Sequence, residues 1–242
     1  MATTTIMTTT KTEHPEQPEQ PEQQQQQPAV SKKAGTPPET LYHVKRVFRF
    51  PTPGHANEIL QPSIRATYTD LAAAKQYASR ALFAEGYQPE QFLELHMRRG
   101  PGTNWVYGDG VLVHAKTADE GLVTVELETT ANTIGELRVA DDGRVQDPLF
   151  FLVQTTIDYS MDWSVGQRQT AIQGVFRTSQ EAEARARTVL LGEDDEVSKS
   201  DFAMYGENVG QEDWPFDANV MVHAVGENGL NILLAVVEGQ AS

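Results

Sequence analysis

The sequence predicts an α+β fold built from two tandem homologous repeats, each a mostly antiparallel sheet with one helix in the order β-β-α-β-β-β. Residues 64–82 align without a gap on residues 172–190, 108 positions later. A second shared pattern, Trp-x-aromatic-x3-Val-x-Val-His-Ala, begins at Trp105 and again at Trp214. In each copy, short apolar runs typical of strands surround a single helical pattern. Self-similarity over this length indicates two domains with the same plan.

We expect four segments along the 242 residues. The first is a disordered tail, because threonine repeats, a Glu-Gln-Pro tandem and a run of glutamines leave almost nothing to bury. Two repeats of about 90 residues, each large enough for an ordinary core, are joined by a connector. The segments are 1–40 (tail), 41–132 (first repeat), 133–148 (connector) and 149–239 (second repeat).

Each repeat is expected to open with an apolar strand, followed by a long polar loop, a short strand, the helix and three further strands. The Asn228-Gly229 pair between two apolar runs is typical of a hairpin. In the first repeat the predicted strands are 41–50, 64–68, 91–98, 111–117 and 122–128, with a loop over 51–63. In the second they are 149–159, 172–176, 201–205, 220–226 and 230–237, with a loop over 160–171.

The helix of the second repeat has the clearer start, since Thr178 and Glu181 have the spacing of a capping box. One face of each helix is rich in alanine, which predicts a close approach of helix to sheet. That face holds Ala74, Ala78, Ala81 and Leu82 in the first repeat, and Ala182, Ala186, Val189 and Leu190 in the second.

The second repeat contains the run Gly-Val-Phe-x-Thr-Ser-x-Glu-Ala-Glu-Ala, beginning at Gly174. It resembles a pattern of small uncharacterised α+β domains, in which a strand ends in a Ser/Thr turn before a Glu/Ala-rich helix. The resemblance covers about 19 residues of each copy and implies the order strand, turn, helix, with no activity attached. The first repeat departs from it, with Ala66 in place of the glycine and Asp70-Leu71-Ala72-Ala73 at the helix start.

Cysteine is absent, which excludes disulfides, thiolate zinc sites and cysteine nucleophiles and fits a reducing compartment. The N-terminus lacks the apolar core of a signal peptide, and the longest apolar run elsewhere is only as long as a strand. We therefore expect a soluble protein of the cytoplasm or nucleus, with no membrane partner.

The net charge of −15 is unevenly distributed, because the second repeat holds 15 acidic and 5 basic residues. An acidic surface repels phosphate backbones, so nucleic acid is not expected as a partner of this repeat. The first repeat carries a group of cations, which forms either a solvated charged face or a surface for nucleic acid, the third hypothesis for function. These cations are Lys45, Arg46, Arg49, Arg98 and Arg99.

Two histidines, His114 and His223, occupy equivalent positions in the two copies. Strand alternation places them on the face opposite the main core, beside Leu112 and Met221. Each histidine either lines a pocket as a titratable group or satisfies a backbone carbonyl under whatever covers that face, and the structural role is the preferred interpretation.

A single zinc site in the first repeat is a further option, because three imidazoles form a known ligand set. It would use His43, His96 and His114. The counterparts of His43 and His96 in the second repeat are expected near Phe151 and near Met204 or Tyr205, so a duplicated zinc site is not predicted.

Three tryptophans complete the candidate ligand-binding residues. Trp105 and Trp214 each precede an aromatic residue by two positions and serve either as core anchors or as ligand contacts. Trp163 and Met161 lie on a long loop without an aromatic counterpart in the first repeat, which favours partner binding.

The outward face of the first strand differs between the copies, since it is basic in the first repeat and apolar in the second. This difference predicts an intramolecular pseudo-dimer, sheet face to sheet face or edge to edge, in which the acidic second repeat complements the cations of the first. A monomeric protein is compatible with that arrangement. Such docking would leave a cleft between the copies as a place for a ligand. The residues of the two faces are His43, Lys45 and Arg49, and Phe151, Val153 and Ile157.

Familiar catalytic and cofactor motifs, including the P-loop and the dinucleotide fingerprint, are missing from the sequence. We therefore expect a non-enzymatic binding or interaction protein for a protein or small-molecule partner, with no cofactor and no metal. The alternative is a small-molecule-binding protein or enzyme of the α+β barrel type that uses His114 or His223 in a cavity.

Overall fold

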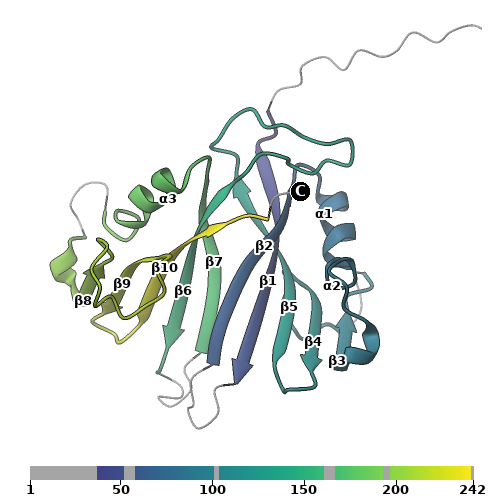
Figure 1. The fold of residues 1–242 in the computed structure, drawn as a ribbon, viewed down its shortest axis with the longest axis horizontal. Coiled ribbons are helices and arrows are strands. Elements are labelled where there is room, and N and C mark those ends of the chain that lie inside the picture. The colour runs from purple at the N-terminus through teal and green to yellow at the C-terminus, as the bar shows by residue number, and fades with distance from the viewer. Residues whose placement is uncertain (1–36, 52–57, 101–103, 161–166, 193–196, 241–242) are drawn as a thin grey trace, which may run out of the picture. The chain divides into compact units, whose positions relative to one another are not determined.

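Two five-stranded antiparallel sheets with matching topology dominate the computed structural model (Figure 1). It describes residues 37–51, 58–100, 104–160, 167–192 and 197–240, all within one unit that spans residues 36–242. The strand order is β2-β1-β5-β4-β3 in the first sheet and β7-β6-β10-β9-β8 in the second. The predicted α+β class with mostly antiparallel sheets is confirmed.

The strands of the first sheet are β1 (Thr40–Pro51), β2 (Glu58–Tyr68), β3 (Phe92–Met97), β4 (Val111–Thr117) and β5 (Leu122–Ala131). Those of the second are β6 (Phe150–Asp158), β7 (Gln167–Phe176), β8 (Phe202–Glu207), β9 (Val220–Gly226) and β10 (Asn231–Glu238). The helices are α1 (Leu71–Ala78), α2 (Ala81–Ala84) and α3 (Ser179–Ala186), with short 3-10 turns at Pro89–Gln91 and Lys199–Asp201.

Irregularities in the strands recur at equivalent positions of the two sheets. The β1–β2 register shifts between Val44 and Lys45, and the β6–β7 register shifts between Leu152 and Val153, 108 positions later. The register shift between β3 and β4 recurs between β8 and β9. The shift between β4 and β5 recurs between β9 and β10. Bulges bend a strand and re-aim side chains, so the two halves share their local distortions as well as their strand order.

The second strand of each repeat is longer than predicted. β2 begins at Glu58 and β7 at Gln167, so the predicted loops over 51–63 and 160–171 are wrong over 58–63 and 167–171, which belong to strands. Their polar residues continue the ladder with the preceding strand, for example Gln61 opposite Phe48. Both are edge strands, where backbone pairing needs no apolar side chain and a proline such as Pro62 is tolerated.

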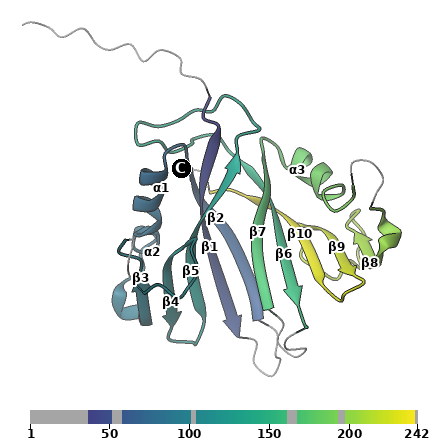
Figure 2. The same cartoon turned by 180° about the vertical axis from the view of Figure 1, so that it is seen from behind.

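The helices begin as predicted from their caps. Thr178 and Glu181 form the reciprocal capping box of α3, and the carboxylate of Asp70 accepts the Ala73 N–H at the start of α1. The alanines of the predicted faces are buried, with Ala74 and Ala182 both fully inaccessible. Each helix therefore lies close against one face of its own sheet (Figure 2). The rest of each face lies outside α1 and α3, since Ala81 and Leu82 belong to the separate α2, and Val189 and Leu190 follow the end of α3.

The opposite faces of the two sheets meet in a third buried cluster, which we call the seam. β5 of the first sheet contacts β7 of the second, and β10 of the second contacts β2 of the first. The seam contains apolar residues from both halves and from the connector: Leu41, Ile64, Val145, Leu149, Phe151, Val153 and Val175. The predicted two-sided burial of the first strand of the second repeat is confirmed, since Phe151 is buried in the seam and Leu152 is buried in the core on the helix side.

Polar groups cross the seam as well. Lys45 has no exposed side-chain surface, and its ammonium donates to the Thr170 carbonyl at 2.7 Å and to the carboxylate of Glu128. Glu126 lies 3.1 Å from the same nitrogen, and the other Glu128 oxygen accepts the Ile172 N–H at 2.7 Å. Every strong donor and acceptor in this group is therefore satisfied within the seam.

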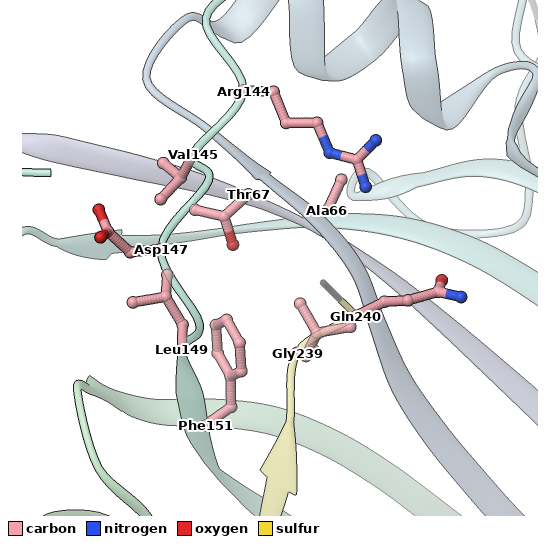
Figure 3. A pocket seen from close by; sticks show the side chains of 10 residues that line it. Ala66, Thr67, Arg144, Val145, Asp147, Leu149, Phe151, Gly239 and Gln240 are labelled. Carbon is pink, nitrogen blue, oxygen red and sulfur yellow. The ribbon is translucent and has the colours of Figure 1, made fainter. Parts of the chain in front are cut away.

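The last described residues, Gly239 and Gln240, lie in the seam. The N–H of Gln240 donates to the Ile64 carbonyl at 3.0 Å, and Gly239 passes directly against the ring of Phe151 (Figure 3). A cavity of about 10 Å³ remains among these residues, Thr67 and Arg144. That volume is about the size needed for one water molecule, so this junction is packed and holds no ligand-sized site.

The prediction that acidic residues of the second half pair with cations of the first half is wrong for the ion pairs that Lys45 and Arg46 form among the described residues. Lys45 pairs with Glu126 and Glu128, and Arg46 with Glu85, all in the first half. Lys45 and Arg49 do contact the second half, but at uncharged oxygens, namely the carbonyl and hydroxyl of Thr170 and the carbonyl of Arg168. For Lys45 the counter-charge is local because the adjacent strand β5 already presents Glu126 opposite it.

Candidate functional site

Each sheet carries a stack of a tryptophan, a second aromatic ring and a histidine. In the first half, Trp105 meets Tyr107 edge to face with ring centroids 4.9 Å apart, and Tyr107 stacks on His114 at 4.1 Å. In the second half, Trp214 lies 5.3 Å from Phe216, which lies 4.6 Å from His223. The structure thus brings together the tryptophan and histidine that the sequence paired in each copy.

The stacked residues also form polar contacts within their own half. The Trp105 indole N–H donates to the Gly108 carbonyl at 3.0 Å, and Nε2 of His223 lies 3.2 Å from the side-chain oxygen of Asn231. The pKa of His114 is lowered by burial and, secondarily, by the neighbouring His96. The expected bond to a backbone carbonyl is not observed, because Nδ1 of His114 is buried without a hydrogen-bond partner among the described residues and Nε2 of His223 meets a side-chain oxygen. The structural role of the histidines and the ligand-binding role of the four residues both stay predictions.

The expected neighbours of the two histidines are wrong. Leu112 and Met221 sit at equivalent bulges, and both pack in the helix-side cores instead of on the histidine face. A bulge inserts one extra residue and breaks the alternation from which the face was predicted.

The counterpart of His96 is also corrected. His96 pairs with His114 across β3 and β4, and Gly206 pairs with His223 across β8 and β9. Gly206 therefore replaces His96, and the Trp214 ring lies over it.

The zinc option of the first repeat is contradicted by the contacts of His43. Both of its ring nitrogens are engaged by threonines, Nδ1 with Thr67 at 3.0 Å and Nε2 with Thr130 at 2.9 Å. In the described parts of the chain, no group of three histidine or acidic side chains is placed to hold a metal ion.

His43 makes folding sensitive to acid. Burial lowers the pKa of its imidazole from 6.5 to about 3. Between these values the unfolded state binds a proton that the folded state does not, so stability falls as the pH drops. The loss for one such group is about 1.4 kcal/mol per pH unit.

We expect that the free energy of unfolding of the wild type falls by about 2 kcal/mol more than that of His43→Gln between pH 7 and pH 5. Urea titrations of both proteins at the two pH values measure the difference. Equal losses would show that His43 is protonated in the folded protein.

Met161 and Trp163, the remaining candidate residues, lie outside the described residues, as does most of the predicted tail.

A groove lies beside α1 in the first half, and sequence reasoning did not identify it. Its volume is about 730 Å³, within the range of small-molecule sites. Three leucines form the apolar part of its lining, and three cationic side chains also line it. These six residues are Leu71, Leu112 and Leu127, and Lys75, Arg98 and Arg99.

The second half has a groove in the equivalent place, of about 580 Å³ beside α3. The equivalence rests on backbone pairing, because the N–H of Arg98 donates to the Leu112 carbonyl and that of Asn208 to the Met221 carbonyl, both at 2.9 Å. Each half therefore has one groove between its helix and its sheet, at an equivalent position of the backbone. We call them the α1 groove and the α3 groove.

Their charges differ. The α1 groove has Lys75, Arg98 and Arg99 against one carboxylate, Asp109. At the matching places the α3 groove has Glu183, Asn208, Val209 and Ala218, with Arg187 as its one cation.

Arg98 is held at the mouth of the α1 groove. Its guanidinium donates to the Asp109 carbonyl and lies 3.9 Å from that residue's carboxylate. Lys75 and Arg99 make no ion pair within the described residues. The α1 groove therefore keeps excess positive charge beside an apolar floor.

Only part of this site had a signal in the sequence. Arg98 and Arg99 belonged to the predicted cation group, but the group is dispersed in the structure, since Lys45 is buried in the seam and Arg46 pairs with Glu85. The five cations therefore do not share one face, and nucleic-acid binding stays a prediction. The leucines come from α1, β4 and β5, and only the fold brings them to one place.

Comparison with protein-family models, with curated proteins and with solved structures finds no match for the chain. The described part of the chain also contains no helix with the length and apolar character that a membrane span requires.

Proposed function

We propose that this is a non-enzymatic binding protein in which a duplicated α+β domain forms an intramolecular pseudo-dimer, and that the α1 groove is its ligand site. The observation that carries the proposal is the pair of equivalent grooves, of which the α1 groove combines an apolar floor with a positive rim.

The pseudo-dimer is supported by the reciprocity of the seam. In an isologous interface, element i of one copy contacts element j of the other, and j contacts i. Here β5 meets β7, the counterpart of β2, while β2 meets β10, the counterpart of β5. His43 and its equivalent Phe151 also meet each other, with ring centroids 5.2 Å apart, as residues near a two-fold axis do.

A binding role without catalysis is supported by the way the titratable groups are placed. The cavities described here are lined by neither His114 nor His223, and both imidazoles contact an aromatic ring. A general acid or base must reach the proton it transfers, which these contacts hinder. The α1 groove, in contrast, combines concave apolar surface with a few polar groups, the usual composition of a ligand site.

Titration of 15N-labelled full-length protein with a fragment library containing anionic, neutral and cationic compounds tests the proposal. We expect binding fragments to shift amide signals around the α1 groove, at Leu71, Arg99 and Leu112. Shifts confined to His114 or His223 would favour the enzyme-like alternative, and an absence of shifts at the α1 groove for all three charge classes would overturn the proposal.

A further inference from the structure

The two grooves form a natural comparison inside one chain, because they share a backbone and differ in a few side chains. In the α3 groove, Arg187 donates to the Asn208 carbonyl at 3.3 Å. With Glu183 beside it, the two charged side chains of that groove cancel. The α1 groove has no such balance, since Ser79 occupies the place of Arg187 and Lys75 that of Glu183.

Three leucines form the apolar surface of the α1 groove. Leu71 is 39 % exposed on α1, whereas Leu112 is 9 % exposed at the bulge of β4. Together with the half-buried Leu127, they present apolar surface between the helix and the ends of the strands. Such surface favours burial of an apolar ligand body, and guanidinium groups favour a carboxylate or phosphate head.

We infer that the α1 groove binds a small anionic amphiphile, a compound with a carboxylate or phosphate head and an apolar body, and that the α3 groove does not. The inference rests on the proposed function and adds the chemical class of the ligand. Arg98 and Arg99 contact the head, while the three leucines contact the body. The bulge that turns Leu112 away from the histidine face supplies the floor of the site.

The test uses three eight-carbon probes on the full-length protein: octanoate, its neutral isostere octanamide, and octylamine. Charged hydrogen bonds are worth more than neutral ones, so we expect octanoate to bind at least about tenfold more tightly than octanamide. Octylamine should bind more weakly than either. Isothermal titration gives the affinities, and 15N amide shifts identify which groove is occupied.

The double variant Arg98→Asn with Arg99→Val gives the α1 groove the residues of the α3 groove. The second repeat already has Asn208 and Val209 at these places, so the change is compatible with the fold. We expect the variant to lose about tenfold in affinity for octanoate and to keep its affinity for octanamide within about twofold. Arg185→Asn, which removes an exposed cation from α3, is the matched control and should change neither affinity.

The outcomes separate the two proposals. Equal binding of octanoate and octanamide at the α1 groove, or equal occupation of both grooves by octanoate, would overturn the anionic class and leave the α1 groove as a binding site. Unchanged octanoate affinity in the double variant would do the same. Failure of all three probes to shift signals at the α1 groove would contradict the proposed function as well.

Discussion

Replacing Lys45 with methionine is expected to lower the free energy of unfolding by about 3 kcal/mol, because it leaves two carboxylates without their shared cation. Lys45 has no exposed side-chain surface, while Glu126 and Glu128 are 21 % and 23 % exposed. The substitution keeps the length and apolar stem of the side chain, so the loss reports on the charge. Urea unfolding of the full chain measures it.

Two further variants show whether the loss comes from the unpaired carboxylates. Adding Glu128→Leu to Lys45→Met should recover part of the stability, since it removes one of the charges left without a partner. Lys75→Met, at an exposed position of α1, should stay within about 0.5 kcal/mol of the wild type. A loss of similar size in Lys75→Met and Lys45→Met would contradict the role of the buried cation.

Replacing Phe151 with alanine is expected to cost about 4 kcal/mol, the usual range for removal of a buried aromatic ring. The ring is 1 % exposed and packs in the seam with Leu41 and Ile64 of the first half. A side-chain carbon on Gly239 would approach it to 2.7 Å, which shows how closely the end of β10 covers it.

Thermal and urea unfolding measure this second effect. Leu93→Ala, at a position that is 62 % exposed on β3, serves as the control and should change stability by less than about 0.5 kcal/mol. A Phe151→Ala loss below about 1 kcal/mol would mean that the two halves contribute little to each other's stability.

Much of the fold could be predicted because its signals are local. The boundaries of β4 and β9 follow from short apolar runs, and the start of α3 follows from Thr178 and Glu181, three residues apart. The same local signals failed for β2 and β7, where pairing with a neighbouring strand extends polar residues into the sheet.

The candidate site depends on features that the sequence does not display. A bulge at Leu112 turns one side chain to the other face, and no residue type marks that position. The pairing of Lys45 with Glu126 and Glu128 depends on strand register, which single-sequence reasoning does not give. The α1 groove joins residues from α1, β4 and β5 with the chain after β3, so it becomes visible only when the sheet is assembled.

We expect the seam to unite the two halves into one cooperative body. Native-state hydrogen exchange of the full chain tests it most directly. We predict that the amides of Val44 in β1 and Leu152 in β6, both fully buried, open with the same free energy, and that Lys45→Met lowers both by the same amount. If β1 loses protection in that variant while β6 keeps its full value, the two repeats unfold independently and the account is contradicted.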